Sequence, residues 1–410
     1  MINEPGSGPE PSGGSESPEP SGGSESPAPS GGSESPAPSG GSESEQPLRR
    51  GWTTGACATA AATAAYQALL TGGFPDPVAV ELPGGKRPEF PLAVAVRRAT
   101  DSATAGVVKD AGDDPDVTHG ALVLATVSEG PTGSGVEFRA GEGVGTVTLP
   151  GLPLPVGEPA INPAPRRMMR EAIARVAAEH GGGGDVVIEI SVQGGEELAR
   201  KTWNPRLGIV GGLSILGTTG VVIPYSCSAW IASIRQGVDV ARATGHGHVI
   251  AATGDTSERA AQARYGLADS ALLDMGDFAG ALLEYLARHP VPRLTLAGGF
   301  AKLSKLAAGH LDLHSARSQV DLERLAESAL AAGASEQLAY AVRGASTALH
   351  ALQLAQAAGV PLADRVAADA RAVAVVTLAG APTEVEVLVV DREGHVVGSS
   401  VPPPRSRAAE

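Results

Sequence analysis

The sequence predicts an α+β domain followed by an α/β domain with a mainly parallel sheet and crossover helices. Between residues 48 and 207, short β-like runs outnumber helical ones, whereas in residues 208–400 β and α runs alternate. Pro and Gly accumulate around residues 201–212, which is typical of a domain boundary. We therefore expect four parts: an arm at 1–47, the two domains, and a flexible tail at 401–410.

The arm has a composition that cannot form a core. It repeats Pro-Ser-Gly-Gly-Ser-Glu-Ser with a period of nine residues and contains no Lys or Arg. Its eight Glu residues account for more than half of the chain's net charge of -14. Low hydrophobicity combined with a single sign of charge predicts a disordered segment.

The first domain is expected to contain two helices among several strands. Thr53 or Thr54 can cap a helix that runs to about Leu70 and ends at the glycines that follow. A second helix begins after Asn162-Pro163 and ends at the glycines of 181–184. The β-like runs are residues 78–82, 92–96, 121–127, 135–140, 145–149 and 185–192.

The second domain alternates strands and helices. Three β-like runs, at 248–254, 271–276 and 293–299, each precede a helical segment, which is the pattern of parallel strands joined by crossover helices. Further helices are expected over 320–358, and a hairpin-like run closes the domain.

Composition excludes several classes of protein. No run of eighteen apolar residues exists, and the first residues lack the features of a signal peptide, so we expect a cytoplasmic protein without a membrane span. Cys57 and Cys227 are too few for a disulfide framework, and no zinc-ligand spacing occurs. The acidic balance and the lack of Lys/Arg runs argue against nucleic-acid binding.

Two Thr-Thr-Gly turns offer hydroxyls and free backbone N–H groups near helix starts, which suits capture of a carboxylate or phosphate. Simple turn chemistry is the alternative, since neither turn matches a P-loop or the G-x-G-x-x-G pattern. The residues concerned are Thr53, Thr54 and Gly55 in the first turn, and Gly217, Thr218, Thr219 and Gly220 in the second.

An acidic stretch and two basic segments are further candidates. The acidic residues are Asp110, Asp113, Asp114 and Asp116, between Lys109 and His119. They could bind a hard cation, accept backbone N–H bonds in Asx-turns, or hold a ligand's ribose or ring N–H. The basic candidates are Arg166 and Arg167, which can bind carboxylates bidentately, and Lys302, Lys305 and His314, which follow a predicted strand end.

Five stretches, in this order, together resemble one family. They are LRRGWTTGACATAAA, VKDAGDDPDVTHG, GEGVGTVTLPGLPLPVGEPAINPAPRRMM, GLSILGTTGVVIPYS and the KLSKLAAG segment. They are similar to the cobalt-precorrin-5B C1-methyltransferases of the anaerobic cobalamin pathway, over about residues 48–400. The chain departs from the pattern at Ala301, where Gly is expected, and at Asp312-Leu313, where Asn-Thr is expected.

The resemblance implies transfer of a methyl group from S-adenosyl-L-methionine to C1 of a ring-contracted tetrapyrrole, giving cobalt-precorrin-6A. Cobalt arrives inside the substrate, and we expect no metal cofactor. Because the tetrapyrrole carries many carboxylates, we expect five basic residues to face it: Arg166, Arg167, Lys302, Lys305 and His314. The two Thr-Thr-Gly turns are expected to bind the donor. The candidate catalytic residues are Asp113, Asp114, Asp116 and His314.

Two other functions compete with this one. A nucleotide-dependent oxidoreductase would use the alternating second domain, although the missing G-x-G-x-x-G pattern weakens it. A tetrapyrrole carrier without catalysis would need no donor site. Homo-oligomerisation and transient contact with other cobalamin-pathway enzymes stay open.

Overall fold

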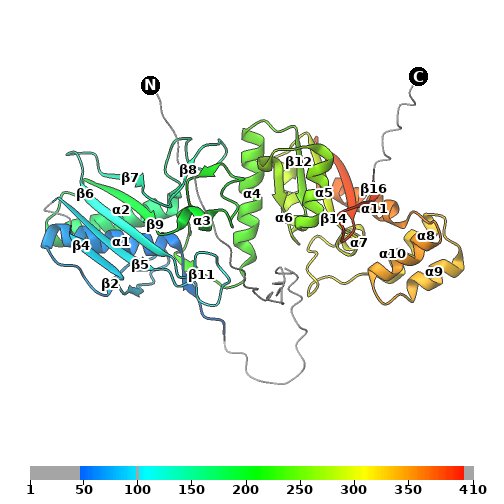
Figure 1. Ribbon diagram of the computed structural model, residues 1–410, viewed down its shortest axis with the longest axis horizontal. Coiled ribbons are helices and arrows are strands. Elements are labelled where there is room, and N and C mark those ends of the chain that lie inside the picture. The colour runs from blue at the N-terminus through cyan, green and yellow to red at the C-terminus, as the bar shows by residue number, and fades with distance from the viewer. Residues whose placement is uncertain (1–46, 98–100, 401–410) are drawn as a thin grey trace, which may run out of the picture. The chain divides into compact units, whose positions relative to one another are not determined.

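The computed structural model describes residues 47–97 and 101–400 (Figure 1). The predicted arm, except for Pro47, and the predicted tail lie outside the described residues. Residues from Leu48 onward cluster as one unit. This unit combines helices with sheets that contain both parallel and antiparallel pairs, which confirms the mixed α/β class. The division between residues 207 and 208 stays a prediction.

One five-stranded sheet is formed by strands from the predicted β-rich region, residues 48–207. Its strands pair antiparallel, except for the parallel pair β7–β9. In order across the sheet they are β4 (Val94–Arg97), β5 (Ser102–Val108), β6 (Leu122–Glu129), β9 (Val186–Val192) and β7 (Val136–Ala140).

Two helices lie beside this sheet, as Figure 1 shows: α1 (Thr54–Thr71) and α2 (Pro163–His180). Both were expected from their end signals. The Thr53 hydroxyl caps α1 by accepting a bond from the Ala56 N–H (3.2 Å), and Gly72 ends it in the left-handed conformation (φ 83°). The small side chains of α1 are buried, and α1 packs against α2, β5 and β6.

Short strand pairs tie distant segments together. β1 (Gly51–Trp52) pairs with β11 (Val221–Val222), and β8 (Thr146–Val147) pairs with β10 (Ile209–Val210), both antiparallel. Segments about 60 to 170 residues apart in the chain are therefore held side by side. A third pair joins β2 (Val78–Ala79) to β3 (Glu89–Phe90), and the short helix α3 (Gly195–Ala199) follows β9.

A second five-stranded sheet contains the later strands. The pairs β13–β12, β12–β14 and β14–β15 are parallel, and β15–β16 is antiparallel. In sheet order these strands are β13 (Leu272–Asp274), β12 (His248–Ala252), β14 (Arg293–Gly299), β15 (Glu384–Val390) and β16 (Val396–Ser399). The connecting helices α5 (Asp255–Tyr265), α6 (Ala279–Arg288) and α7 (Phe300–Ala307) follow β12, β13 and β14 in turn.

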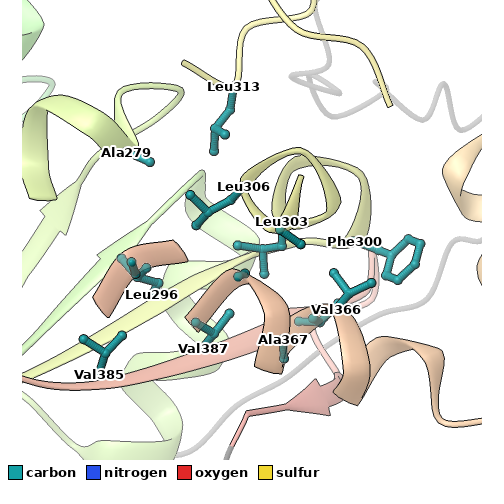
Figure 2. Close-up of a cluster of buried hydrophobic side chains, with 14 of the residues drawn as sticks. Ala279, Leu296, Phe300, Leu303, Leu306, Leu313, Val366, Ala367, Val385 and Val387 are labelled. Carbon is teal, nitrogen blue, oxygen red and sulfur yellow. The ribbon is translucent and has the colours of Figure 1, made fainter. Parts of the chain in front are cut away.

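The core of this region lies between the second sheet and its helices. Figure 2 shows Leu296 of β14 and Val387 of β15 beside Leu303 of α7 and Val366 of α11 (Leu362–Thr377). Burial of such aliphatic side chains is the main favourable contribution to folding. The remaining helices are α8 (Leu322–Ala331), α9 (Glu336–Arg343) and α10 (Ala348–Ala357), within the expected 320–358.

Several described elements lie outside the runs expected from the sequence. Among them, β5 begins with Ser, Ala, Thr and Gly before its two Val residues, α4 (Cys227–Ala243) has a glycine at position 237, and α11 lies beyond the expected 320–358. Among the helices that the structure describes, none has the length and apolarity needed to cross a bilayer.

Candidate functional site

The two Thr-Thr-Gly turns pack directly against each other. Thr53 N donates to Gly220 O (3.0 Å), and Gly55 N donates to Leu216 O (2.9 Å). The Thr54 hydroxyl accepts a bond from Leu216 N (3.1 Å). Two motifs that the sequence places more than 160 residues apart thus form one structural feature.

Close approach of the two backbones requires glycine on both sides. A Cβ at Gly217 would lie 2.3 Å from the Thr53 hydroxyl oxygen, and the φ of 122° also disfavours other residues. A Cβ at Gly55 would lie 2.7 Å from Pro165 Cγ and 2.9 Å from Leu216 O. The glycines of both turns therefore have a packing reason that is independent of any ligand.

A cavity of about 190 Å³ opens beside the first turn. It brings together polar side chains from segments that are separated in the sequence, and α4 contributes Ser233 and Gln236. The polar lining from the other segments is Thr53, Thr54, Lys109, Asp116, Thr118, Asn162, Thr202, Asn204 and Ser214. A concave site with a few convergent polar groups is the usual form of a small-molecule site.

A partly buried ion pair lies in this lining. The Lys109 side chain is only 1% exposed, and its Nζ lies 2.6 Å from Asp116 Oδ2. The other oxygen of Asp116 accepts bonds from Thr118 N (2.7 Å) and the Thr118 hydroxyl (2.6 Å). Burial alone would raise the pKa of Asp116, but the Lys109 charge and these hydrogen bonds outweigh it, so the pKa lies below its ordinary value.

The Lys109 ammonium also lies near Cys57, the buried thiol in the first turn of α1. Burial raises the pKa of Cys57 to about 12, although the positive charge of Lys109 acts in the opposite direction. A thiol with this pKa stays protonated at neutral pH, so Cys57 is not a ready nucleophile.

A second polar pair lines the cavity. The Ser214 hydroxyl donates to Asn204 Oδ1 (3.0 Å), and Asn204 Nδ2 donates to Gly212 O (3.3 Å). Both side chains are buried. These bonds fix the Asn204 amide at the cavity wall, where it can orient a polar ligand group.

The other acidic residues of the 110–116 stretch bind protein groups. Asp110 forms a bidentate ion pair with Arg49, and the hydrogen bond from Arg49, followed by the one from Gly112 N, holds the pKa of Asp110 below its ordinary value. Asp113 accepts a bond from Arg49 N (2.6 Å), and Asp114 accepts one from Tyr225 N (2.8 Å). Of the three acidic candidates, Asp116 alone lines the cavity.

The arginines of α2 differ from each other. Arg166 donates from Nε to Ile161 O (2.7 Å) and from Nη2 to Glu158 (2.9 Å), and it lies over the Phe138 ring. These contacts occupy the guanidinium with the loop that precedes α2. Arg167 is exposed.

The basic residues after β14 form a separate group. Lys302 Nζ donates to Thr253 O (3.0 Å) and lies 3.2 Å from Asp277 Oδ1. Lys305 is buried and donates to Leu313 O (2.9 Å), and burial lowers its pKa. The exposed His314 accepts a bond from Ala316 N at its Nδ1 (3.2 Å). None of these three side chains lines the cavity beside the first turn.

Asp312, which stands where the family pattern has Asn, forms hydrogen bonds within its own loop. Asp312 accepts a bond from His314 N (3.1 Å) and another from Arg317 (2.6 Å). This carboxylate therefore stabilises the loop that presents His314.

Sequence reasoning did not select several lining residues. Lys109, Asn162, Asn204 and Ser214 have no mutual spacing that a pattern could reveal, because four separate segments contribute them. The sequence offered one hint for Lys109, which directly precedes the acidic stretch and could therefore pair with one of its carboxylates.

Comparison with known proteins gives one family over most of the chain. The family model described as CbiD matches residues 41–224, and the model for the CbiD C-terminal domain matches residues 312–401. A solved cobalamin biosynthesis protein (cbiD) from Archaeoglobus fulgidus is 30% identical. That match covers 66% of this chain and 83% of the other, with a TM-score of 0.37.

Curated relatives match more closely. A cobalt-precorrin-5B C(1)-methyltransferase from Paramagnetospirillum magneticum is 60% identical over 87% of this chain and 99% of its own length. One of the same name from Brucella anthropi is 61% identical over 85% of this chain and 95% of its own length. These matches confirm the resemblance found in the five motifs, and the chain belongs to the CbiD family of cobalt-precorrin-5B C(1)-methyltransferases.

Proposed function

We propose that this chain transfers a methyl group from S-adenosyl-L-methionine to C1 of cobalt-precorrin-5B, giving cobalt-precorrin-6A. Relatives that carry this enzyme's name are 60% identical across nearly their whole length, which supports the same reaction here. The structural observation that carries the proposal is the cavity beside the first Thr-Thr-Gly turn, where several of the family's motifs meet.

The cavity suits a reaction that depends on positioning. Transfer of a methyl group from a sulfonium is an in-line displacement in which the ring carbon forms a bond to the methyl carbon as the sulfur leaves. The protein's main contribution is to hold these two carbons in near-attack geometry. Rigid turns, buried hydrogen-bonded side chains and glycine-dependent packing provide fixed walls for this purpose. Cobalt is part of the substrate in this proposal.

Roles for the candidate residues follow from their exposure. The second Thr-Thr-Gly turn exposes Thr218 and Thr219, which can bind the methionine part of the donor. We assign ligand contact to Asp116 among the acidic candidates, because it lines the cavity. Among the basic residues, Arg167 and His314 are the most accessible to the carboxylates of a tetrapyrrole, whereas Arg166 and Lys305 support the surrounding loops.

The finer architecture belongs to the same proposal. We infer an α+β part that carries the cavity and an α/β part whose three parallel strand pairs present Lys302 near a strand end. Ligands of open α/β sheets bind at such ends.

A single-turnover experiment tests the reaction. The purified chain is mixed with methyl-labelled S-adenosyl-L-methionine and cobalt-precorrin-5B, and the product is examined by mass spectrometry and NMR. We expect one labelled methyl group at C1. Tight tetrapyrrole binding without label transfer would instead indicate a carrier.

A calorimetric experiment tests the donor turn. Thr219→Val removes an exposed hydroxyl, and Thr71→Val removes a comparable one at the far end of α1. We expect weaker binding of S-adenosylhomocysteine only in Thr219→Val. An unchanged dissociation constant in a folded variant removes this turn from the donor site.

A further inference from the structure

Lys109 lines the cavity, and its side-chain ammonium has more hydrogen-bond donors than the described part of the chain supplies acceptors for. A lysine ammonium has three N–H donors. Within residues 47–97 and 101–400, its hydrogen-bond partner is Asp116, at 2.6 Å. Two donors on a side chain that is 1% exposed therefore lack a protein acceptor. Buried donors without acceptors are costly, and native proteins rarely leave them so.

The surroundings hold this ammonium at one place. Lys109 N donates to Ala121 O (2.9 Å), and Lys109 O accepts a bond from Gly120 N (2.8 Å), which fixes the backbone. Asp116 is fixed in turn by its two bonds from Thr118. The three N–H groups of an ammonium point in different directions, so the two that do not point at Asp116 are directed away from it.

We propose that Lys109 binds a carboxylate of the ligand that fills the cavity. A carboxylate supplies two acceptor oxygens, which match the two free donors, and charge-assisted bonds of this kind are the stronger ones. Asn162 lines the same cavity, and its side-chain amide can donate to the same group. The inference rests on the proposed function only in taking this cavity as the ligand site.

Two ligands could supply this carboxylate: the amino-acid end of the methyl donor, and an acetate or propionate side chain of the tetrapyrrole. Both present the same chemistry to Lys109. The experiment therefore needs one pair of probes for each source, with the carboxylate as the only difference within a pair.

Calorimetry with two probe pairs distinguishes them. The donor pair is S-adenosylhomocysteine and its decarboxylated analogue, and the tetrapyrrole pair is a stable cobalt corrinoid with free carboxylates and its fully amidated derivative. In one pair we expect the unmodified protein to prefer the carboxylated member. Lys109→Met should reduce that preference by roughly 10- to 100-fold, the range for a hydrogen bond to a charged group.

Controls separate this role from a structural one. Lys86→Met removes an exposed lysine that follows a turn and should leave both preferences unchanged. Because Lys109→Met leaves Asp116 without its cation, Lys109→Met/Asp116→Asn provides a neutral replacement if the single variant unfolds. The double variant should show the same loss of preference.

A preference for the carboxylated probe that survives in the folded variants overturns the inference. Equal binding of both members of each pair by the unmodified protein also overturns it. The proposed function fails separately, if no methyl transfer occurs while the Lys109-dependent preference is present.

Discussion

Asp274, the last residue of β13, is a carboxyl group whose surroundings oppose its ionisation. Burial raises the pKa of Asp274 to about 6, and the charges of Glu258 and Asp255 act in the same direction. The Gly276 N–H and Arg206 oppose this shift without cancelling it. In the folded state the carboxyl therefore holds its proton to a higher pH than it does in the unfolded chain.

The sign of the stability effect follows from this difference. Between the unfolded pKa and about 6, the folded state binds more protons, so stability falls as pH rises through this window and the loss is complete above it. Asp274→Asn removes the ionisation while keeping an oxygen for Gly276 N. We expect the variant to be more stable than the parent at pH 7.5, by about 1–2 kcal/mol after allowance for partial exposure.

Melting temperatures between pH 5 and pH 8 check this expectation. The gap between variant and parent should narrow as pH decreases from 8 to 5. An equal gap at every pH would show that Asn acts through packing and not through the charge.

The acidic stretch could be recognised in the sequence, whereas the partner of each carboxylate depends on the fold. Asp110, Asp113, Asp114 and Asp116 are chemically identical in the sequence, and turn chemistry was among the alternatives it allowed. Their roles differ because their partners differ: Arg49 for two of them, Tyr225 N for the third, and Lys109 for Asp116. These partners lie up to 111 residues away, and local patterns carry no information about them.

At the scale of elements, α1 is distinguished by its small side chains, because residues 54–65 are all Ala, Thr, Gly or Cys. Ala61 is fully buried, and α1 packs against α2 on one side and β5 and β6 on another. A larger side chain at this fully buried position would have to displace its neighbours. Ala61→Leu should therefore lower the free energy of unfolding by about 1–3 kcal/mol through overpacking.

Urea unfolding measures this cost. Ala178→Leu, on the exposed side of α2, makes the same chemical change where space is available and should alter stability by less than about 0.5 kcal/mol. Similar losses in both variants would point to a general effect of leucine and against tight packing of α1.

Element prediction succeeded where end signals were strong. α1 begins and ends within a residue or so of the positions that Thr53 and Gly72 indicate, and α2 begins at Pro163 and ends before Gly181. β5 gave no such signal because its inward positions include the small residues Ala103 and Ala105, which are buried because β5 packs against α1. The packing of β5 in the folded protein, and not the β-propensity of its residues, accounts for this strand.

At the scale of the whole molecule, one ion pair joins a segment before β10 to the second sheet's helices. Arg206 forms a bidentate pair with Glu258 of α5, with both distances 2.7 Å, and this bond raises the pKa of the guanidinium. The guanidinium also lies over the Trp203 ring, 4.7 Å from its centre. Arg206 therefore links the Trp203 side of the cavity wall to α5.

A double-mutant cycle measures the strength of this link. We expect Arg206→Met and Glu258→Gln each to destabilise the protein, with a coupling energy of about 1–2 kcal/mol. Thermal or urea unfolding of the two single variants and the double variant provides the values. Additive effects would show that the two side chains act independently.

The candidate site as a whole was only partly predictable. Each Thr-Thr-Gly turn could be identified from its own residues, and so could the acidic stretch. That the turns touch, and that Lys109 and Asn204 share one cavity, depends on how distant segments fold together. Such contacts are long-range properties of the packed chain, which spacing along the sequence does not encode.

The contact between the two turns has a consequence for protein engineering. Since Gly217 leaves no room for a Cβ beside Thr53, and Gly55 none beside Leu216, the segments around 53–55 and 216–220 are matched surfaces. A chimaera of two relatives should exchange both segments together. If only one segment is exchanged, it will contact a segment from the other relative, to which it is not matched in shape. Both segments should therefore come from the same parent.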